Sequence, residues 1–145
     1  MASSAEINSL IAVGEAFDAS KLTGYGNTQS QQNSFMHAMC DESRQTIGDC
    51  VAATNAFVAK EMAEAIRLVA SDKSGALKHL GVAMHVIMDH GSPWHTDSNG
   101  NPKPWGSVKN FIDHKGEKFG GTPSSAQMES MKSALLARYQ QVFKR

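Results

Sequence analysis

The feature that most constrains the fold of this chain is a long segment of helical periodicity from Ile47 to Ser71. Its apolar residues recur at spacings of three, four and seven, with alanines of high helix propensity between them. These apolar positions are Val51, Phe57, Val58, Met62, Ile66 and Val69. Because such spacing places them along one side of a helix, the segment predicts an amphipathic helix with one buried face.

Further helices are predicted on both sides of this segment. They span residues 5–17, Gly75 to Asp89, a short stretch near Gly106–Phe119, and Ser125 to Arg145. Clusters of Gly, Pro, Ser and Asn separate them and predict turns. Residues 27–34 are expected to form a loop or the entry to a helix, and no segment predicts a strand. The expected fold is therefore all-α, a compact multi-helix domain.

Length and composition narrow the class of protein. The chain has 145 residues, which suits one domain spanning residues 1–145, and its formal net charge is zero. It has no apolar run of the roughly 18 residues that a membrane span needs, and no basic stretch that would start a signal peptide. Two cysteines, Cys40 and Cys50, are too few for a disulfide framework, so we expect two buried free thiols.

The stretch HVIMDHGSPWHT contains the strongest chemical signal. His85 and Asp89 are four residues apart, so on a helix an imidazole nitrogen and a carboxylate oxygen can converge on one ion. The rest of this helix is nearly all apolar, and a buried carboxylate is costly unless it is paired or bound to a cation. Pro93 stiffens a turn that can bring His95 back over the helix end. These residues predict a metal site.

The segment LGVAMHVIMDHGSPWHT resembles the signature of the zinc-dependent phospholipase C superfamily, an all-helical fold shared with the fungal and plant single-strand nucleases. The similarity spans roughly Phe35 to Phe119 and implies this fold type in reduced length, because the family enzymes are longer. Upstream, NSFMHAMCD resembles the family segment with an earlier histidine ligand, matched by His37. Downstream, DHKGEKF resembles the family's His-x-x-x-Glu pair, with Asp113 in place of the histidine, Glu117 as the glutamate and His114 one position late.

The resemblance implies a set of metal ligands and catalytic groups. One zinc ion would be held by His37, His85 and Asp89, and a second by His95, Glu117 and either Asp113 or His114. The expected cofactor is therefore one or two Zn²⁺ ions, which together activate water and stabilise charge on the reacting oxygens. The family also uses an aspartate near its first zinc, for which Asp18 is the candidate, with Glu15 behind it. Asp18 and Asp89 are the expected catalytic residues.

The resemblance also implies an activity. It predicts a phospholipase C-like phosphodiester hydrolase, with a phospholipid favoured over a nucleic acid because the neutral net charge does not attract polyanions. A metal-dependent nuclease and a non-catalytic, metal-stabilised binding domain remain alternatives. The second alternative is favoured if Asp113 disables the second metal site.

The combination of SFMHAM with GVAMH and SPWHT also resembles C-terminal toxin domains that follow RHS repeats in secreted bacterial proteins, including type VI effectors. This implies delivery into a target cell as part of a larger protein, and a cognate immunity protein as a partner.

The other histidines and the tryptophans have simpler interpretations. His79 is expected to face solvent or to be partly packed, and His90 to be an exposed turn residue or to orient a ligand. Trp94 and Trp105 either pack around the loop or line a substrate cleft. The eight methionines recur at helical spacing and are expected to fill the core.

Overall fold

The computed structural model describes residues 2–105 and 124–143, and its regular structure is helical. The elements are α1 (Ser4–Asp18), the 3₁₀ helix η1 (Gln31–His37), α2 (Ile47–Leu68), α3 (Lys73–Gly91) and α5 (Ser125–Phe143). The described residues contain no strand, and their only β pairing is two isolated bridges. The all-α prediction is confirmed, and the helix predicted near residues 106–119 lies outside the described residues. No helix in the described ranges is long and apolar enough to cross a bilayer.

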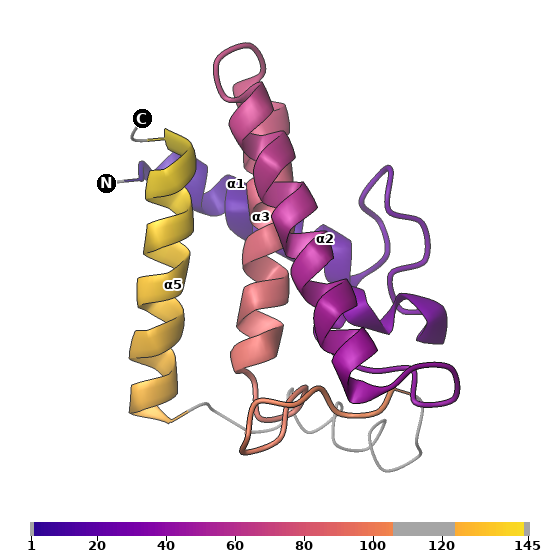
Figure 1. Cartoon of the computed structure of the whole chain (residues 1–145). Helices are drawn as coiled ribbons and strands as arrows, with labels where there is room; N and C mark the ends of the chain where they lie inside the picture. Colours follow the sequence, from indigo (N-terminus) through magenta and orange to yellow (C-terminus); the bar gives the residue numbers. More distant parts are fainter. Residues whose placement is uncertain (1, 106–123, 144–145) are drawn as a thin grey trace.

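Helix α3 is the central element. In Figure 1, α2 lies beside it, α5 flanks its other side and α1 crosses behind it. Helix α3 contacts α1, α2, α5 and η1. Most of the middle of α3 is apolar and buried, and such a helix needs neighbours on several sides. Its buried residues include Ala76, Leu77, Leu80, Gly81, Val82, Ala83, Met84 and Val86.

Local signals set the helix ends close to the predicted positions. Helices α1 and α2 begin with capping boxes, in which Ser3 pairs with Glu6 and Thr46 pairs with Asp49. Helix α3 extends two residues beyond each end of its predicted range. Helix α1 ends at Asp18, one residue later than predicted, so this carboxylate belongs to the helix end rather than to the following loop.

Two glycines allow α1 and α3 to cross closely. A Cβ atom at Gly81 would lie 2.7 Å from Cγ1 of Val13, and one at Gly14 would lie 3.5 Å from Nδ1 of His85. Because Val13 is β-branched and stiff, a side chain at Gly81 would push the helices apart. This crossing brings the end of α1 against the part of α3 that contains His85.

The core has two parts. The first lies between α2, α3 and α5 and consists of Met62, Ala65, Leu80, Ala83, Met84, Tyr139 and Val142. The second lies between α1, η1, α2 and α3 and consists of Phe17, Ala38, Phe57, Val82 and Val86. The second cluster places apolar side chains next to the histidines described below, since the ring centroid of Phe17 lies 5.6 Å from that of His37 and 5.4 Å from that of His85.

Cys40 and Cys50 form a disulfide bond, so the expectation of free thiols was wrong. The segment after η1 turns back to the start of α2, and this path brings the two Cα atoms to 5.3 Å, within the usual range for a disulfide. Sequence spacing alone does not reveal such a turn. The bond ties the segment that follows His37 to the first turn of α2.

Removing the disulfide is expected to destabilise the fold. For two cysteines separated by 10 residues in sequence, the loop-closure relation gives about 2.5–3 kcal/mol in the free energy of unfolding. We expect this loss in denaturant unfolding of a Cys40→Ser/Cys50→Ser variant, and in the wild type after reduction by a phosphine. As a control, the phosphine should not change the stability of the double variant. Equal stability of wild type and double variant under oxidising conditions would contradict the prediction.

Candidate metal centre

The candidate site lies where α1, η1 and α3 end near one another. Asp18 is the last residue of α1 and His37 the last residue of η1. His85 and Asp89 lie one turn apart in the second half of α3, and His95 follows the turn at Pro93. The structure therefore brings together side chains from four segments of the chain.

The carboxylate of Asp89 is the common neighbour of the three histidines. Its Oδ2 atom lies 3.0 Å from Nδ1 of His37 and 3.2 Å from Nε2 of His85. The same oxygen lies 3.9 Å from Nδ1 of His95. Three imidazole nitrogens thus lie within 3.9 Å of one carboxylate oxygen at the end of α3.

Asp18 completes the group from the side of α1. Its Oδ1 atom lies 4.0 Å from Nδ1 of His37. One ligand atom from each of Asp18, His37 and His85 lies within 4.8 Å of the others, so this group could hold a metal ion. In a tetrahedral zinc site with bonds of about 2.0–2.2 Å, ligand atoms are roughly 3.2–3.6 Å apart. Ligand atoms 4.8 Å apart would have to approach by about 1.2–1.6 Å to fit that geometry.

The site is buried around His37 and His95 and open to solvent at Asp18. His37 and His95 are buried, the side chains of His85 and Asp89 are each 13% exposed, and that of Asp18 is 52% exposed. Nε2 of His85 is buried and lies 3.2 Å from Oδ2 of Asp89, and it makes no well-aligned hydrogen bond to any of the residues that the structure describes. A buried ring nitrogen without an aligned hydrogen bond is costly, and a cation bound between it and the carboxylate would satisfy both groups.

The charges at the site shift two pKa values in opposite directions. Burial raises the pKa of Asp89, but the charge of His95 and the contacts with His37 and His85 outweigh it and hold this pKa far below its ordinary range. Burial lowers the pKa of His85, but the carboxylates of Asp89 and Asp18 outweigh it and raise this pKa above 6.5. Asp89 is therefore ionised at neutral pH.

Gln29 contacts Asp18 and His37, and the sequence did not predict this role. Its amide nitrogen donates to the backbone oxygen of Asp18 at 2.7 Å and to Oδ1 of the same residue at 3.0 Å. The same nitrogen lies 3.2 Å from Nε2 of His37. Gln29 lies in a polar run without periodicity, and no sequence signal distinguishes it from its neighbours. The contacts of Gln29 therefore hold the end of α1 next to the end of η1.

The segment after the Pro93 turn is joined to the segment after η1 by backbone hydrogen bonds. The amide of Cys40 donates to the carbonyl of Lys103 at 2.9 Å, and the amide of Lys103 donates to the carbonyl of His95 at 2.8 Å. Nδ1 of His95 donates to the carbonyl of His37 at 2.6 Å, which fixes the orientation of this ring. The ring of Trp105 stacks on that of His37 with 5.7 Å between centroids.

A second buried polar cluster, also missed at the level of sequence, anchors the loop that contains Gln29. Glu61 is buried on α2, accepts a hydrogen bond from the hydroxyl of Tyr25, and lies 2.7 Å from Nδ1 of His79. His79 is therefore partly packed, one of its two expected states. Burial and the neighbouring carboxylate raise the pKa of Tyr25. A signal existed, since Glu61 follows the buried Phe57 by four residues on the same helix face.

Of the residues predicted to bind a second metal ion, one lies within the described residues. His95 lies beside Asp89, whereas Asp113, His114 and Glu117 lie outside the described residues. His90 is exposed at the end of α3, which agrees with the simpler of its two interpretations.

No family model, curated protein or solved structure matches the chain. The fold and the candidate site therefore rest on the chain's own residues and their contacts.

Replacing Asp89 with Asn tests the electrostatics of the metal-free site. The carboxylate holds the pKa of His85 above its ordinary value of 6.5, against the effect of burial. In Asp89→Asn we expect the His85 pKa to fall below that of the wild type. Burial still lowers this pKa, and the negative charge of Asp89 that raised it is gone. An NMR titration of the His85 ring protons in chelator-treated protein measures this change.

The same change should alter how stability depends on pH. Folding raises the pKa of His85, so the protonated ring adds to the free energy of unfolding. This added stability is fully present below pH 6.5 and is lost as pH rises through the folded-state pKa. As pH rises through this range, the free energy of unfolding of Asp89→Asn should therefore fall less than that of the wild type. Asp72→Asn, which preserves the α3 cap, is the matched control and should leave the His85 titration unchanged. An unaltered titration in Asp89→Asn would contradict this account.

Proposed function

We propose that this chain is a zinc-dependent phosphodiester hydrolase of the phospholipase C type and that its substrate is a phospholipid. The observation that carries the proposal is the convergence of Asp18, His37, His85 and Asp89 from three helices around one small volume. The resemblance of LGVAMHVIMDHGSPWHT to the phospholipase C signature supports the same activity.

The donor chemistry suits zinc. The imidazoles of His37 and His85 and the carboxylate of Asp89 are ligands that Zn²⁺ accepts, and three protein ligands would leave one position for water. The exposure of Asp18 leaves one side open to water and substrate, as a catalytic site requires and a closed structural site does not. His95, with Glu117 and either Asp113 or His114, remains the predicted ligand set for a second ion.

The chain's own groups have separable roles in hydrolysis. A bound zinc ion would polarise a phosphoryl oxygen and lower the pKa of water at the site. Asp89 supplies a fixed negative charge, because its pKa is held low and its oxygen is fixed by His37. Asp18, exposed at the opening, accepts the proton of the attacking water as its oxygen bonds to phosphorus. The bond from phosphorus to the leaving oxygen breaks, and that oxygen takes up the proton that Asp18 accepted.

An apolar groove next to the metal ligands favours a lipid substrate. Its volume is about 340 Å³, and it runs between α1, α3 and α5 to Asp18 and His85. Its apolar residues are Ile7, Leu10, Ile11, Met84, Met88 and Leu135. Ile7 and Ile11 are 46% and 55% exposed, so part of this apolar lining faces solvent, and exposed apolar patches often mark binding surfaces. A phosphodiester with an apolar substituent fits this surface better than a nucleic acid does.

The disulfide supports an extracellular or delivered protein. Bonds of this kind persist in oxidising compartments and are rare in the reducing cytosol. Together with the resemblance to toxin domains that follow RHS repeats, this favours a toxin domain of a larger secreted bacterial protein. A cognate immunity protein is the partner that this proposal implies.

Metal content and hydrolysis test the proposal together. We expect purified protein to hold one or two zinc ions per chain and to release headgroup from phosphatidylcholine vesicles. His85→Ala and Asp89→Ala should lower zinc occupancy and reduce activity by about a thousandfold or more, since the metal and its oriented water are lost together. Element analysis and headgroup release measure these effects.

His79→Asn is the matched histidine control, because His79 contacts Glu61 rather than the metal ligands. It should retain zinc and activity at temperatures where it is folded. Absence of zinc in protein purified without chelators would overturn the proposal. Cleavage of single-stranded DNA with intact vesicles would instead indicate the nuclease alternative, and zinc without either activity the binding domain.

A charge in the apolar groove should affect lipid hydrolysis selectively. We expect Ile11→Glu to lower kcat/KM on phosphatidylcholine vesicles by about tenfold, because burying a carboxylate against an acyl chain is unfavourable. Hydrolysis of a small soluble phosphodiester should fall much less. Ile47→Glu, at a similarly exposed isoleucine outside the groove, is the control. An equal fall on both substrates would show that the groove does not contact lipid.

A further inference from the structure

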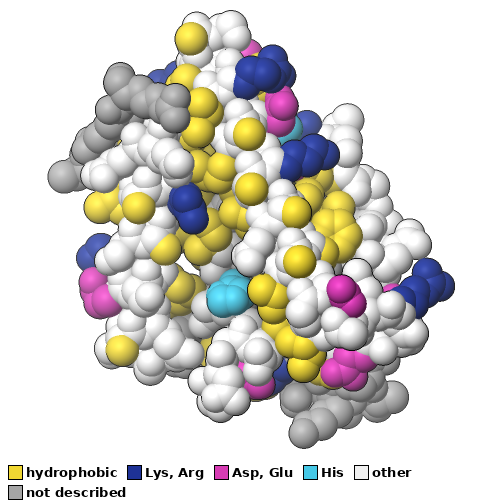
Figure 2. All heavy atoms as spheres, viewed as in Figure 1, with side chains coloured by type: hydrophobic (Ala, Val, Ile, Leu, Met, Phe, Trp, Pro, Cys, Tyr) yellow, Lys and Arg dark blue, Asp and Glu magenta, His cyan; other side chains and the backbone are white. Residues whose placement is uncertain are grey.

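A second hollow lies between α2 and α5 and is separate from the metal centre. Its volume is about 550 Å³, which is within the range of small-molecule sites. Figure 2 shows that hydrophobic side chains line it and that a histidine lies at its lower edge. Val58, Met62 and Ile66 of α2 and Val86 of α3 form its apolar wall.

The hollow and the metal centre use different faces of α3. Val86 and His90 border the hollow, whereas His85 and Asp89 belong to the metal centre. Successive residues on a helix point about 100° apart, so these two i, i+4 pairs face different directions. A ligand can therefore occupy the hollow without passing the metal ligands.

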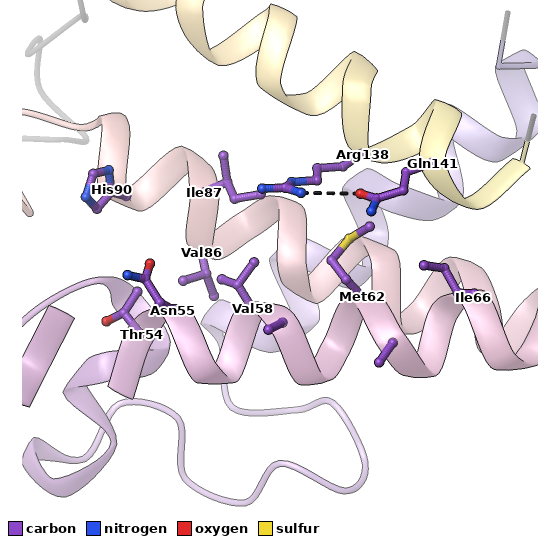
Figure 3. Close-up of a pocket in the computed structure, with 12 residues that line it drawn as sticks. Thr54, Asn55, Val58, Met62, Ile66, Val86, Ile87, His90, Arg138 and Gln141 are labelled. Carbon is purple, nitrogen blue, oxygen red and sulfur yellow. Dashed lines mark hydrogen bonds between the residues drawn. The ribbon is translucent and has the colours of Figure 1, made fainter. Parts of the chain in front are cut away.

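The polar groups around the hollow favour an anion. Arg138 and His90 are its ionisable lining residues within the described chain, and no carboxylate joins them. The Arg138 guanidinium donates to Oε1 of Gln141 at 3.3 Å, and within the described residues it makes no ion pair. Figure 3 shows this bond, with the guanidinium beside Ile87 and above the apolar wall. The guanidinium keeps further donors for a ligand.

We propose that this hollow binds a single-chain anionic amphiphile, a long-chain fatty carboxylate. The carboxylate would accept hydrogen bonds from Arg138, the geometry for which a guanidinium is best suited. The aliphatic chain would lie along Val58, Met62 and Ile66, which span about two turns of α2. A single cation beside an apolar wall fits one charged head and one tail, and it does not fit a polyanion such as a nucleic acid.

Ligand binding to the intact chain tests this proposal. Dodecanoate, below its micelle concentration, should bind and shift the NMR signals of Met62 and Ile66. Dodecyltrimethylammonium, with the same tail and opposite charge, should bind at least about tenfold more weakly, because Arg138 repels it. Equal binding of the two amphiphiles would overturn the proposal, as would shifts confined to Met88 and Ile7 in the groove beside the metal centre.

Two variants separate the head and tail contacts. Arg138→Gln should weaken dodecanoate binding about tenfold, whereas Lys132→Gln, on the same helix but outside the hollow, should not. Ala63→Phe should fill the hollow and abolish the Met62 and Ile66 shifts. If Ala63→Phe does not fold, the Arg138→Gln affinity and the shift pattern decide the question. Unchanged affinity in Arg138→Gln would overturn the proposal.

Discussion

The structure depends on the carboxylate of Asp89, which is only 13% exposed near the end of the central helix. A carboxylate in such surroundings must be paired or must bind a cation, since the cost of its burial is otherwise large. Its neighbours are imidazoles from η1, from α3 itself and from the segment after Pro93. Segments that are far apart in sequence therefore meet around this one group.

Three further contacts hold those segments in place. The Cys40–Cys50 disulfide fixes the segment after η1 to α2, and backbone hydrogen bonds fix the same segment to residues 95–105. The close crossing at Gly81 brings α1 onto α3, so that Asp18 reaches the site. Each contact restrains a different side chain of the candidate metal centre, and together they hold these side chains close to one another.

The central helix also separates two surfaces with different chemistry. One side presents His85 and Asp89 next to an apolar groove, and another presents Val86 and His90 to the hollow under Arg138. Both surfaces combine apolar walls with a few charged groups, an arrangement that suits amphiphilic ligands. Both proposals therefore concern amphiphilic ligands, although they rest on different residues.

Much of the fold could be predicted from sequence because helix periodicity and caps are local. The long segment from Ile47 and the apolar helix around His85 were predicted within three residues of their observed ends, and the i, i+4 pairing of His85 with Asp89 follows from the helix alone. Gln29 and the disulfide could not be predicted in this way. Both depend on the path of irregular segments, which has no periodic signal.

The sequence by itself determined that α3 has a histidine and a carboxylate on one face of an apolar helix, because 3.6 residues per turn fixes which side chains are neighbours. Only the tertiary structure decided that Asp18, His37 and His95 join them and that Cys40 meets Cys50. The physical reason is the distance along the sequence between the residues that make contact. Contacts within a helix follow from its own geometry, whereas contacts between segments require the loops and the core to pack together.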